Sequence, residues 1–297
     1  NVTIHETAET NTTRPIPRMN PRSSVLLSLV LIPAWRGGEP VQTARNVSEE
    51  HHGRRLRGTV SSSRDGMPRT REVEMSETLR LSDEELQRIL ELVRDADSVE
   101  LKLTIHETVR ASTAAALDAD PLDAQVRQVF FFDTPDLVLN GAGVVVRARR
   151  RQGEEGDTVV KLRPVVPGDL PKDLRSSKSF NVEVDSMPGG YVCSASFKGS
   201  ADNGTIRQVA RGEGSIRKLF SKEQQEFYGA HAPDGVELDD LTVLGPIPIL
   251  KLKVNPQGFG RRLVGEMWLY PDGSQIVELS TKAAPSEAFQ VFAEARA

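Results

Sequence analysis

The chain has 297 residues and a formal net charge of −4 at pH 7. This length allows one large β-rich domain or two ordinary ones, and the small net charge excludes a protein basic enough to coat nucleic acid, so any basic site must be local. The single cysteine, Cys193, excludes an intrachain disulfide and favours a cytoplasmic location.

Residues 1–74 differ in composition from the rest of the chain. They contain eleven Arg and no Lys, are rich in Ser, Pro, Gly and Thr, and show no sustained apolar periodicity, as expected for a segment that cannot bury a core. The apolar run 25–32 is shorter than the roughly 20 residues that span a bilayer, and no Ala-x-Ala cleavage site follows it. We predict no membrane association. Residues 1–74 are predicted to be a disordered or non-native extension of an ordered domain, 75–297, and the native product is expected to begin near Met75.

The ordered region combines two kinds of periodicity. Apolar residues at helical spacing predict helices over 82–94, 111–117, 216–231 and 285–296, and Ser82 to Glu85 form a capping box at the start of the first. Alternation with a period of two predicts eight strands, over 99–105, 126–133, 144–151, 158–163, 180–185, 249–254, 263–270 and 276–280. Residues 189–214 are mixed and rich in small side chains, and no strand is assigned there.

The strands at 144–151 and 158–163 carry the most informative pattern. Alternate side chains of a strand point to opposite faces, so Arg147, Arg149 and Arg151 share one face, as do Lys161 and Arg163 on the next strand. The opposite faces are apolar. This arrangement indicates a sheet curled around a charged, wet interior.

Charged or polar pairs two residues apart recur on six strands. Any one pair usually marks the solvated face of an antiparallel sheet, whereas the whole set favours a closed barrel with charges inside. Burying so many charges requires pairing or bound ions, which predicts a polyanion and a metal in the interior. The pairs are Glu100/Lys102, Arg147/Arg149, Lys161/Arg163, Glu183/Asp185, Lys251/Lys253 and Glu278/Ser280, with Lys282 following.

Residue chemistry narrows the ligand. The planar guanidinium of Arg donates two parallel hydrogen bonds to phosphate, and Lys acts as a movable point charge. Carboxylates without His or Cys neighbours select Mg²⁺ or Mn²⁺. The five His do not cluster, and the sequence has no Walker loop, no Gly-x-Ser-x-Gly elbow and no dinucleotide-binding glycine pattern.

These motifs, in this order, resemble the CYTH superfamily, the triphosphate tunnel metalloenzymes. The resemblance covers about residues 75–297 and is carried by Glu100-Leu-Lys102, Phe132-Asp-Thr-Pro, Arg147-Ala-Arg149, Lys161-Leu-Arg163, Glu183-Val-Asp185 and Glu278-Leu-Ser-Thr-Lys282. It implies an α+β fold, mainly antiparallel: an eight-stranded closed β-barrel flanked by helices. It also implies activity with a divalent metal on a linear triphosphate, as in inorganic triphosphatases, thiamine triphosphatases and class IV adenylate cyclases.

The resemblance also implies roles for individual residues. Phosphate is expected on Lys102, Arg147, Arg149, Lys161, Arg163, Lys251, Lys253 and Lys282, and Mg²⁺ or Mn²⁺ on Glu100, Glu183, Asp185 and Glu278. Glu100 and Lys102 are the expected catalytic pair. Two positions depart from the family pattern, because Ser98 and Ser280 stand where the family has metal-binding Glu.

The sequence therefore predicts a metal-dependent phosphohydrolase acting on inorganic triphosphate or a triphosphorylated metabolite. Two alternatives stay open: a polyphosphate- or nucleotide-binding module without turnover, and a class IV-type adenylate cyclase. The predicted partner is a small polyphosphate and not a nucleic acid. The sequence does not indicate an oligomeric state.

Overall fold

The structure is a computed structural model that describes residues 83–188 and 190–296. The predicted extension over residues 1–74, the expected start at Met75 and the capping residue Ser82 lie outside the described residues. Among the described residues, no helix is both long enough and apolar enough to cross a membrane.

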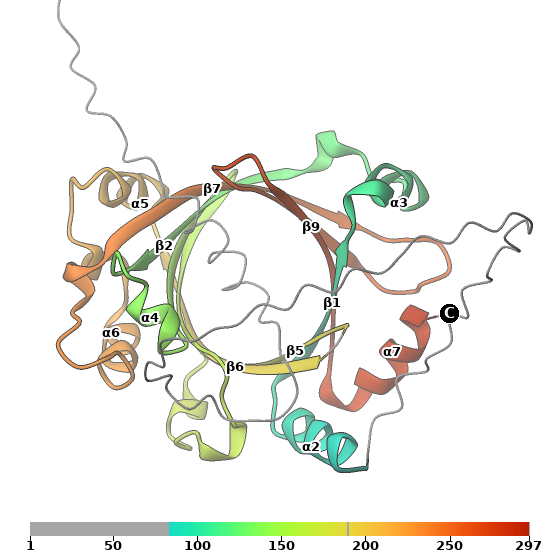
Figure 1. Cartoon of the computed structure of the whole chain (residues 1–297), viewed down its shortest axis with the longest axis horizontal. Coiled ribbons are helices and arrows are strands. Elements are labelled where there is room, and N and C mark those ends of the chain that lie inside the picture. Colours follow the sequence, from blue (N-terminus) through green and yellow to red (C-terminus); the bar gives the residue numbers. More distant parts are fainter. Residues whose placement is uncertain (1–82, 189, 297) are drawn as a thin grey trace, which may run out of the picture.

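Nine strands close into a barrel, which Figure 1 shows as a ring seen end-on. Around the ring the order is β1-β5-β6-β4-β3-β2-β7-β8-β9, with β9 returning to β1. All the strand pairs are antiparallel except β1 with β5. The strands are β1 (Ser98–Ile105), β2 (Gln125–Asp133), β3 (Val144–Arg151), β4 (Glu154–Leu162), β5 (Phe180–Met187), β6 (Gly190–Ala201), β7 (Thr242–Val254), β8 (Leu263–Leu269) and β9 (Gln275–Ala283).

The predicted closed, mainly antiparallel barrel is confirmed, with nine strands in place of eight. The additional strand is β6, which pairs with both β4 and β5. Its small side chains hide the usual strand signal, and at Gly199 the packing leaves no room for a side chain. A Cβ at Gly199 would lie 2.6 Å from Oε1 of Gln224, on the helix that covers β6 at this point.

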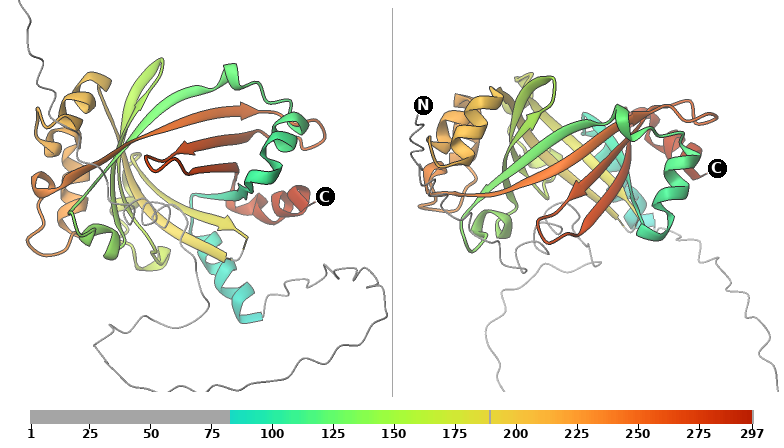
Figure 2. Two further views of the ribbon diagram at one scale, coloured as in Figure 1. Left: turned by 45° about the horizontal axis from the view of Figure 1, so that its top comes forward. Right: turned by 90° about the horizontal axis from the view of Figure 1, so that it is seen from above.

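Helices surround the outside of the barrel (Figures 1 and 2). They are α2 (Asp83–Arg94), α3 (Arg110–Ala116), α4 (Val138–Gly141), α5 (Asn203–Ala210), α6 (Lys222–Gly229) and α7 (Ala288–Arg296). Short 3-10 turns occupy Glu107–Val109, Pro121–Asp123, Pro167–Asp169, Leu174–Ser176, Ile216–Leu219, Leu238–Asp240 and Pro285–Glu287. The single helix predicted over 216–231 is wrong in its first part, because Ser221 caps α6 with a capping box and separates it from the preceding turn.

The main hydrophobic core lies between the barrel's outer surface and the helices. It joins Val93 of α2, Ile206 of α5 and Phe227 of α6 to outward-facing strand residues such as Val146 and Val160. The inward-facing neighbours on the same strands are largely charged. The predicted division into an apolar outer face and a charged interior is therefore confirmed.

Strand β7 begins seven residues earlier than the predicted Ile249, at Thr242. Pro246 and Pro248 argue against a strand there, because proline cannot donate a hydrogen bond to a neighbouring strand. The register between β2 and β7 shifts at this point. Gly245, at φ 133°, permits the close approach, since a Cβ would lie 2.8 Å from the Val129 carbonyl oxygen.

Candidate functional site: a charged cavity inside the barrel

The barrel encloses a cavity of about 700 Å³. This volume falls within the range of about 300–1,000 Å³ found for small-molecule sites. Its charged lining residues come from eight of the strands, all but β2, and from the segments just after β4 and just before β8: Glu100, Lys102, Arg147, Arg149, Lys161, Arg163, Glu183, Lys198, Lys251, Arg261, Arg262, Glu266, Glu278 and Lys282. The interior thus has the mixed charge that the strand pairs predict.

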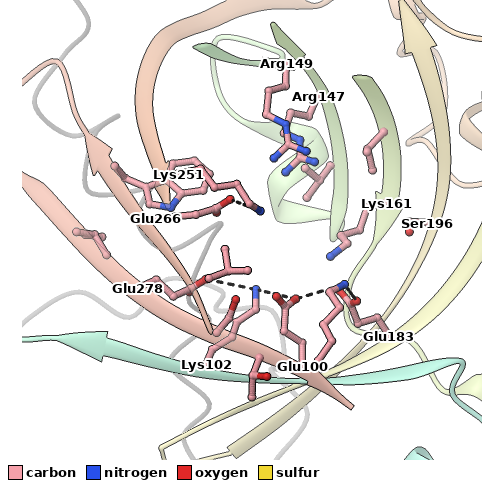
Figure 3. Close-up of a pocket in the computed structure, with 18 of the residues that line it drawn as sticks. Glu100, Lys102, Arg147, Arg149, Lys161, Glu183, Ser196, Lys251, Glu266 and Glu278 are labelled. Carbon is pink, nitrogen blue, oxygen red and sulfur yellow. Dashed lines mark hydrogen bonds and ion pairs between the residues drawn. The ribbon is translucent and has the colours of Figure 1, made fainter. Parts of the chain in front are cut away.

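One side of the cavity is basic. Arg147 and Arg149 of β3, together with Lys161 of β4, form what we call the basic wall. The two arginines project into the cavity from the side opposite Glu100 and Glu183 (Figure 3). Arg149 donates from Nε to Asp157 at 2.8 Å, and Arg147 lies 3.8 Å from the same carboxylate.

Lys161 has no ion-pair or hydrogen-bond partner for its amine within the part of the chain that the structure describes. Burial lowers the pKa of Lys161, although the carboxylates of Asp185 and Glu183 act in the opposite direction. Burial likewise lowers the pKa of Arg147 to about 10, and neighbouring Arg149 adds to the shift. The basic wall is therefore short of negative charge, a condition that an anionic ligand would relieve.

The opposite side holds three carboxylates, here called the carboxylate cluster: Glu100 of β1 with Glu183 and Asp185 of β5. Each brings one oxygen within 4.8 Å of the other two. The parallel pairing of β1 with β5 sets Glu100 beside Asp185 and Ser98 beside Glu183. Side chains that are distant in sequence are thus brought together by the strand pair that closes the barrel.

Two lysines, Lys102 and Lys282, form ion pairs with the carboxylate cluster. Lys102 lies 3.5 Å from Asp185, 3.8 Å from Glu100 and 3.7 Å from Glu278. Burial acts to lower the pKa of Lys102, but the surrounding carboxylates outweigh it and raise the pKa above the usual value. Lys282 of β9 is 52% exposed, pairs with Glu183 and lies 3.7 Å from Glu100.

The carboxylates differ in protonation tendency. Burial raises the pKa of Glu100, and Glu183 adds to the shift, while Lys102 and Lys282 oppose it. Glu183 has a pKa lowered to about 2, because Lys282 and Lys161 together outweigh the effect of its burial. Burial also raises the pKa of Glu278. The site therefore contains one firmly ionised carboxylate beside two whose ionisation is opposed by burial.

The carboxylate cluster fits a hard divalent cation. Its donors are all oxygen, as Mg²⁺ and Mn²⁺ require, and no His or Cys is among them. Asp185 is fully buried, and neither of its oxygens accepts a hydrogen bond within the described part of the chain, where its contacts are ion pairs with Lys102 and Arg163. Either oxygen of Asp185 could therefore bind a metal ion.

The structure places most of the predicted site residues in this one cavity. Glu278, a predicted metal ligand, lies outside the three-residue cluster and reaches it through Lys102. Lys251 lines the cavity and pairs with Glu266 at 3.0 Å. Lys253 is exposed near the end of β7 and is not among the cavity-lining residues.

Several charged residues that line the cavity or pair with its lining residues were not predicted as site residues from the sequence. Asp157 sits four residues before Lys161 on β4, on the same face, so strand alternation could have identified it had the strand been started earlier. Glu266, which the sequence offers only as a substitute metal ligand, shares the inward face of β8 with Val264 and Trp268 and lines the cavity. Four further cationic residues have no charged residue two positions away, which is the pattern used for the prediction: Arg127, Lys198, Arg261 and Arg262.

An apolar part of the lining was also missed. Phe131, Val145, Trp268, Tyr270 and Ile276, here called the apolar sector, line the cavity and pack on Val129, Ile247 and Ile249. The sequence signal was present, because these residues share a strand face with the charged ones. This pattern does not by itself indicate a cavity, because apolar residues on one face of a strand are typical of an ordinary hydrophobic core.

No protein-family model matches the chain, and no curated protein matches it. Solved structures do match. A "putative adenylate cyclase" from Bacillus halodurans is 12% identical with a TM-score of 0.47, covering 67% of this chain and 87% of its own. HpAC1 from Hippeastrum, a "putative adenylyl cyclase" described as having a dominant triphosphatase activity, is 15% identical with a TM-score of 0.48, covering 66% and 84%. A third, from Vibrio parahaemolyticus, is 10% identical with a TM-score of 0.32, covering 67% and 84%.

These TM-scores are all below one half, so they say nothing about activity. The features that bear on function are the chain's own closed barrel and the charges that it encloses.

Proposed function

We propose that the barrel binds a linear triphosphate in its interior and that the protein is a Mg²⁺- or Mn²⁺-dependent phosphohydrolase. One observation carries the proposal: two arginines with too few counter-charges, Arg147 and Arg149, face a cluster of three carboxylates across the cavity inside the barrel, and Lys161 lies between them. A polyphosphate chain with a divalent cation would neutralise both sides at once.

In this proposal the basic wall holds the phosphates. Arg147 and Arg149 offer planar donors suited to phosphate oxygens, and the amine of Lys161 supplies a third contact that needs no bond to be broken first. Arg163, Lys251 and Lys282 are further phosphate contacts around the cavity, as predicted from the sequence. Lys253 contributes through long-range attraction at most, given its exposed position.

Glu100, Glu183 and Asp185 would hold the metal, with Glu278 beside them. When bound, the divalent cation neutralises charge on the phosphoryl oxygens and lowers the pKa of bound water. Lys102 stays protonated among its carboxylates, so its role is to stabilise negative charge on the transferred phosphoryl group. Glu100 orients the reactants from the same strand, two residues away.

The departures at Ser98 and Ser280 favour one alternative. Ser98 donates a hydrogen bond to Glu183 at 3.2 Å, and Ser280 lies opposite Lys102 on β9. Neither hydroxyl supplies an anionic ligand, which weakens metal retention. A polyphosphate- or nucleotide-binding module without turnover is therefore the second candidate.

Product analysis tests the proposal. Purified protein is incubated with inorganic triphosphate, ATP or thiamine triphosphate, each with Mn²⁺, Mg²⁺ or chelator, and products are separated by ion-exchange chromatography. Metal-dependent release of orthophosphate supports the phosphohydrolase. Cyclic AMP with pyrophosphate would identify the cyclase alternative, and tight binding without any product would identify the binding module.

A further inference from the structure

The helices do not cover the outside of the barrel all the way round. Seen from above (Figure 2, right), β7 and the β8–β9 hairpin face the viewer, and the helices lie to either side of them. Side chains alternate along these strands, so Met267 points outward between the cavity-lining residues Glu266 and Trp268. This side of the barrel therefore presents a sheet face without a covering layer.

The strand register makes this outer face continuous. Outward-facing side chains lie directly opposite one another across β7, β8 and β9 in two rows, which together we call the open sheet face. One row is Leu250, Met267 and Val277, and the other is Leu252, Gly265 and Leu279. Within the described part of the chain, the apolar side chains of both rows pack against neither hydrophobic core.

The open sheet face is apolar and accessible. The outward-facing positions from Pro248 onward on β7, and those along β8, β9 and β1, carry no charged residue. The rows extend to Leu103 of β1 and Val126 of β2, which are 49% and 45% exposed. Five strands about 4.8 Å apart, over the roughly 20 Å length of β8, give a footprint of roughly 400 Å². Apolar patches of this size on soluble proteins commonly mark interaction surfaces.

The shape of the face favours a second copy of the chain as its partner. Met267 projects from the central strand, and Gly265, two residues earlier, leaves a hollow beside Leu279. A twofold axis crossing β8 midway between Gly265 and Met267 would set Met267 of each copy over Gly265 of the other. A Cβ at Gly265 would make only an ordinary contact, at 3.5 Å from the Leu279 side chain. The fold of a single chain therefore leaves this hollow free for another molecule.

We propose that two copies of the chain associate through the open sheet face, in a symmetric dimer with β8 at its centre. Two apolar sheets can pack face to face about 10 Å apart, and here no charge would lose its water. A footprint of roughly 400 Å² per copy is about half that of a standard interface, so the dissociation constant should be about 1–100 µM. The inference is independent of the proposed function, because the cavity residues point to the other side of the same strands.

Three substitutions separate this face from the rest of the surface. Met267→Asp places a charge at its centre, where two copies would bring two like charges together. Gly265→Val fills the hollow but keeps the face apolar, and valine is favoured in strands. Val166→Asp is the control for an added carboxylate. Its side chain is 57% exposed and follows β4, which lies across the ring from β8.

The test is sedimentation velocity of the full chain and the three variants, from about 1 µM to about 300 µM. We expect the parent and Val166→Asp to change from monomer to dimer over this range. Met267→Asp and Gly265→Val should each weaken the dimer about tenfold or more. Thermal melting followed by circular dichroism verifies that each variant folds. If Met267→Asp does not fold, Gly265→Val decides the question, because its substitution suits a strand.

Three results would overturn the inference. A parent that stays monomeric at every concentration would leave the open sheet face to a different partner. A parental dimer that Met267→Asp and Gly265→Val leave unchanged would be formed through another surface. Growth beyond the dimer as the concentration rises, with Gly265→Val growing as readily as the parent, would show non-specific association of apolar surface instead of a fitted pair.

Discussion

Lys161 is the residue whose replacement separates ligand binding from folding most cleanly. Its side chain lines the cavity, its amine has no hydrogen-bond or ion-pair partner among the described residues, and burial lowers its pKa. Lys161→Met should therefore keep or raise the melting temperature and weaken triphosphate binding about tenfold or more. Scanning calorimetry and titration calorimetry measure the two effects. Lys222→Met, at an 87% exposed side chain, is the charge-matched control, and equal weakening by both variants would remove Lys161 from the site.

Ser98 tests the assignment of the metal site. Its hydroxyl already bonds to Glu183, so Ser98→Glu would place an additional carboxylate beside the cluster. Two opposite charges about 4 Å apart attract by about 4 kcal/mol at an effective dielectric constant of 20, before desolvation. We expect Mn²⁺ to bind about tenfold more tightly in the absence of phosphate, as measured by calorimetry. Ser98→Gln, of similar size and neutral, should give no gain, and a gain with Gln as large as with Glu would show that charge is not the cause.

At the residue scale, alternation along strands predicted the facing of Arg147, Arg149 and Lys161 correctly, because facing is a local property of an extended chain. The partner of each charge was not predictable. Asp157 of β4 pairs with Arg149 of β3, and the register of these two strands shifts between Arg149 and Arg151. The sequence of one strand does not determine its register with the next. Lys253 lies on the same face of β7 as Lys251, but it is one residue from the end of the strand and does not line the cavity.

At the element scale, Gln224 connects α6 to the barrel wall. It is fully buried, accepts from the Thr158 hydroxyl at 3.0 Å and donates to the Phe197 carbonyl at 3.1 Å. Gln224→Met should lower the free energy of unfolding by about 1–3 kcal/mol, because it leaves buried polar groups without these partners. Urea denaturation measures the change. Glu226→Gln on the exposed side of the same helix should alter stability by less than about 0.5 kcal/mol.

The pair Glu183–Lys282 connects β5 to β9 across β1 and gives a pH dependence of known sign. Glu183 has a pKa of about 2 in the folded protein against 4.5 as its ordinary value. A depressed carboxyl pKa contributes stability above pH 4.5, and this contribution is lost as the pH falls toward 2. In chelator, Glu183→Gln should therefore show a shallower loss of unfolding free energy over this range than the parent.

Glu100 provides the control of opposite sign. Its pKa is raised, so protonation above pH 4.5 stabilises the folded chain, and Glu100→Gln should differ from the parent in that higher range instead. Both variants are followed by urea denaturation at a series of pH values. If the free energy of unfolding falls equally for the parent and for Glu183→Gln between pH 4.5 and pH 2, the assignment of the Glu183–Lys282 ion pair is wrong.

Helices and strands were predicted correctly where the apolar periodicity is regular. The prediction failed for β6 and for the first half of β7, where packing against neighbouring elements requires residues that are unusual in strands. Gly199 of β6 is explained by the close approach of α6, and Pro246 of β7 lies where the register with β2 shifts next to Val129. Both are tertiary effects, which a single strand's sequence does not carry. The parallel β1–β5 pair was also unexpected, and it is this pair that assembles the carboxylate cluster.

At the scale of the whole molecule, the barrel separates two environments. Apolar packing lies outside, between the strands and the helices, while the interior keeps its charges in mutual contact. This arrangement, with apolar residues outside the barrel and charged residues inside, was predictable from the sequence because the two kinds of residue alternate on the same strands. The apolar sector is the exception to this rule inside the cavity.

In the proposed function, triphosphate and metal bind together inside the barrel. A crystal structure of the full chain with inorganic triphosphate and Mn²⁺, with anomalous diffraction locating the metal, tests this directly. The predicted result is an anomalous peak among Glu100, Glu183 and Asp185 and phosphate density along Arg147, Arg149 and Lys161. Triphosphate bound on the outer surface, or Mn²⁺ bound away from these three carboxylates, would contradict the account.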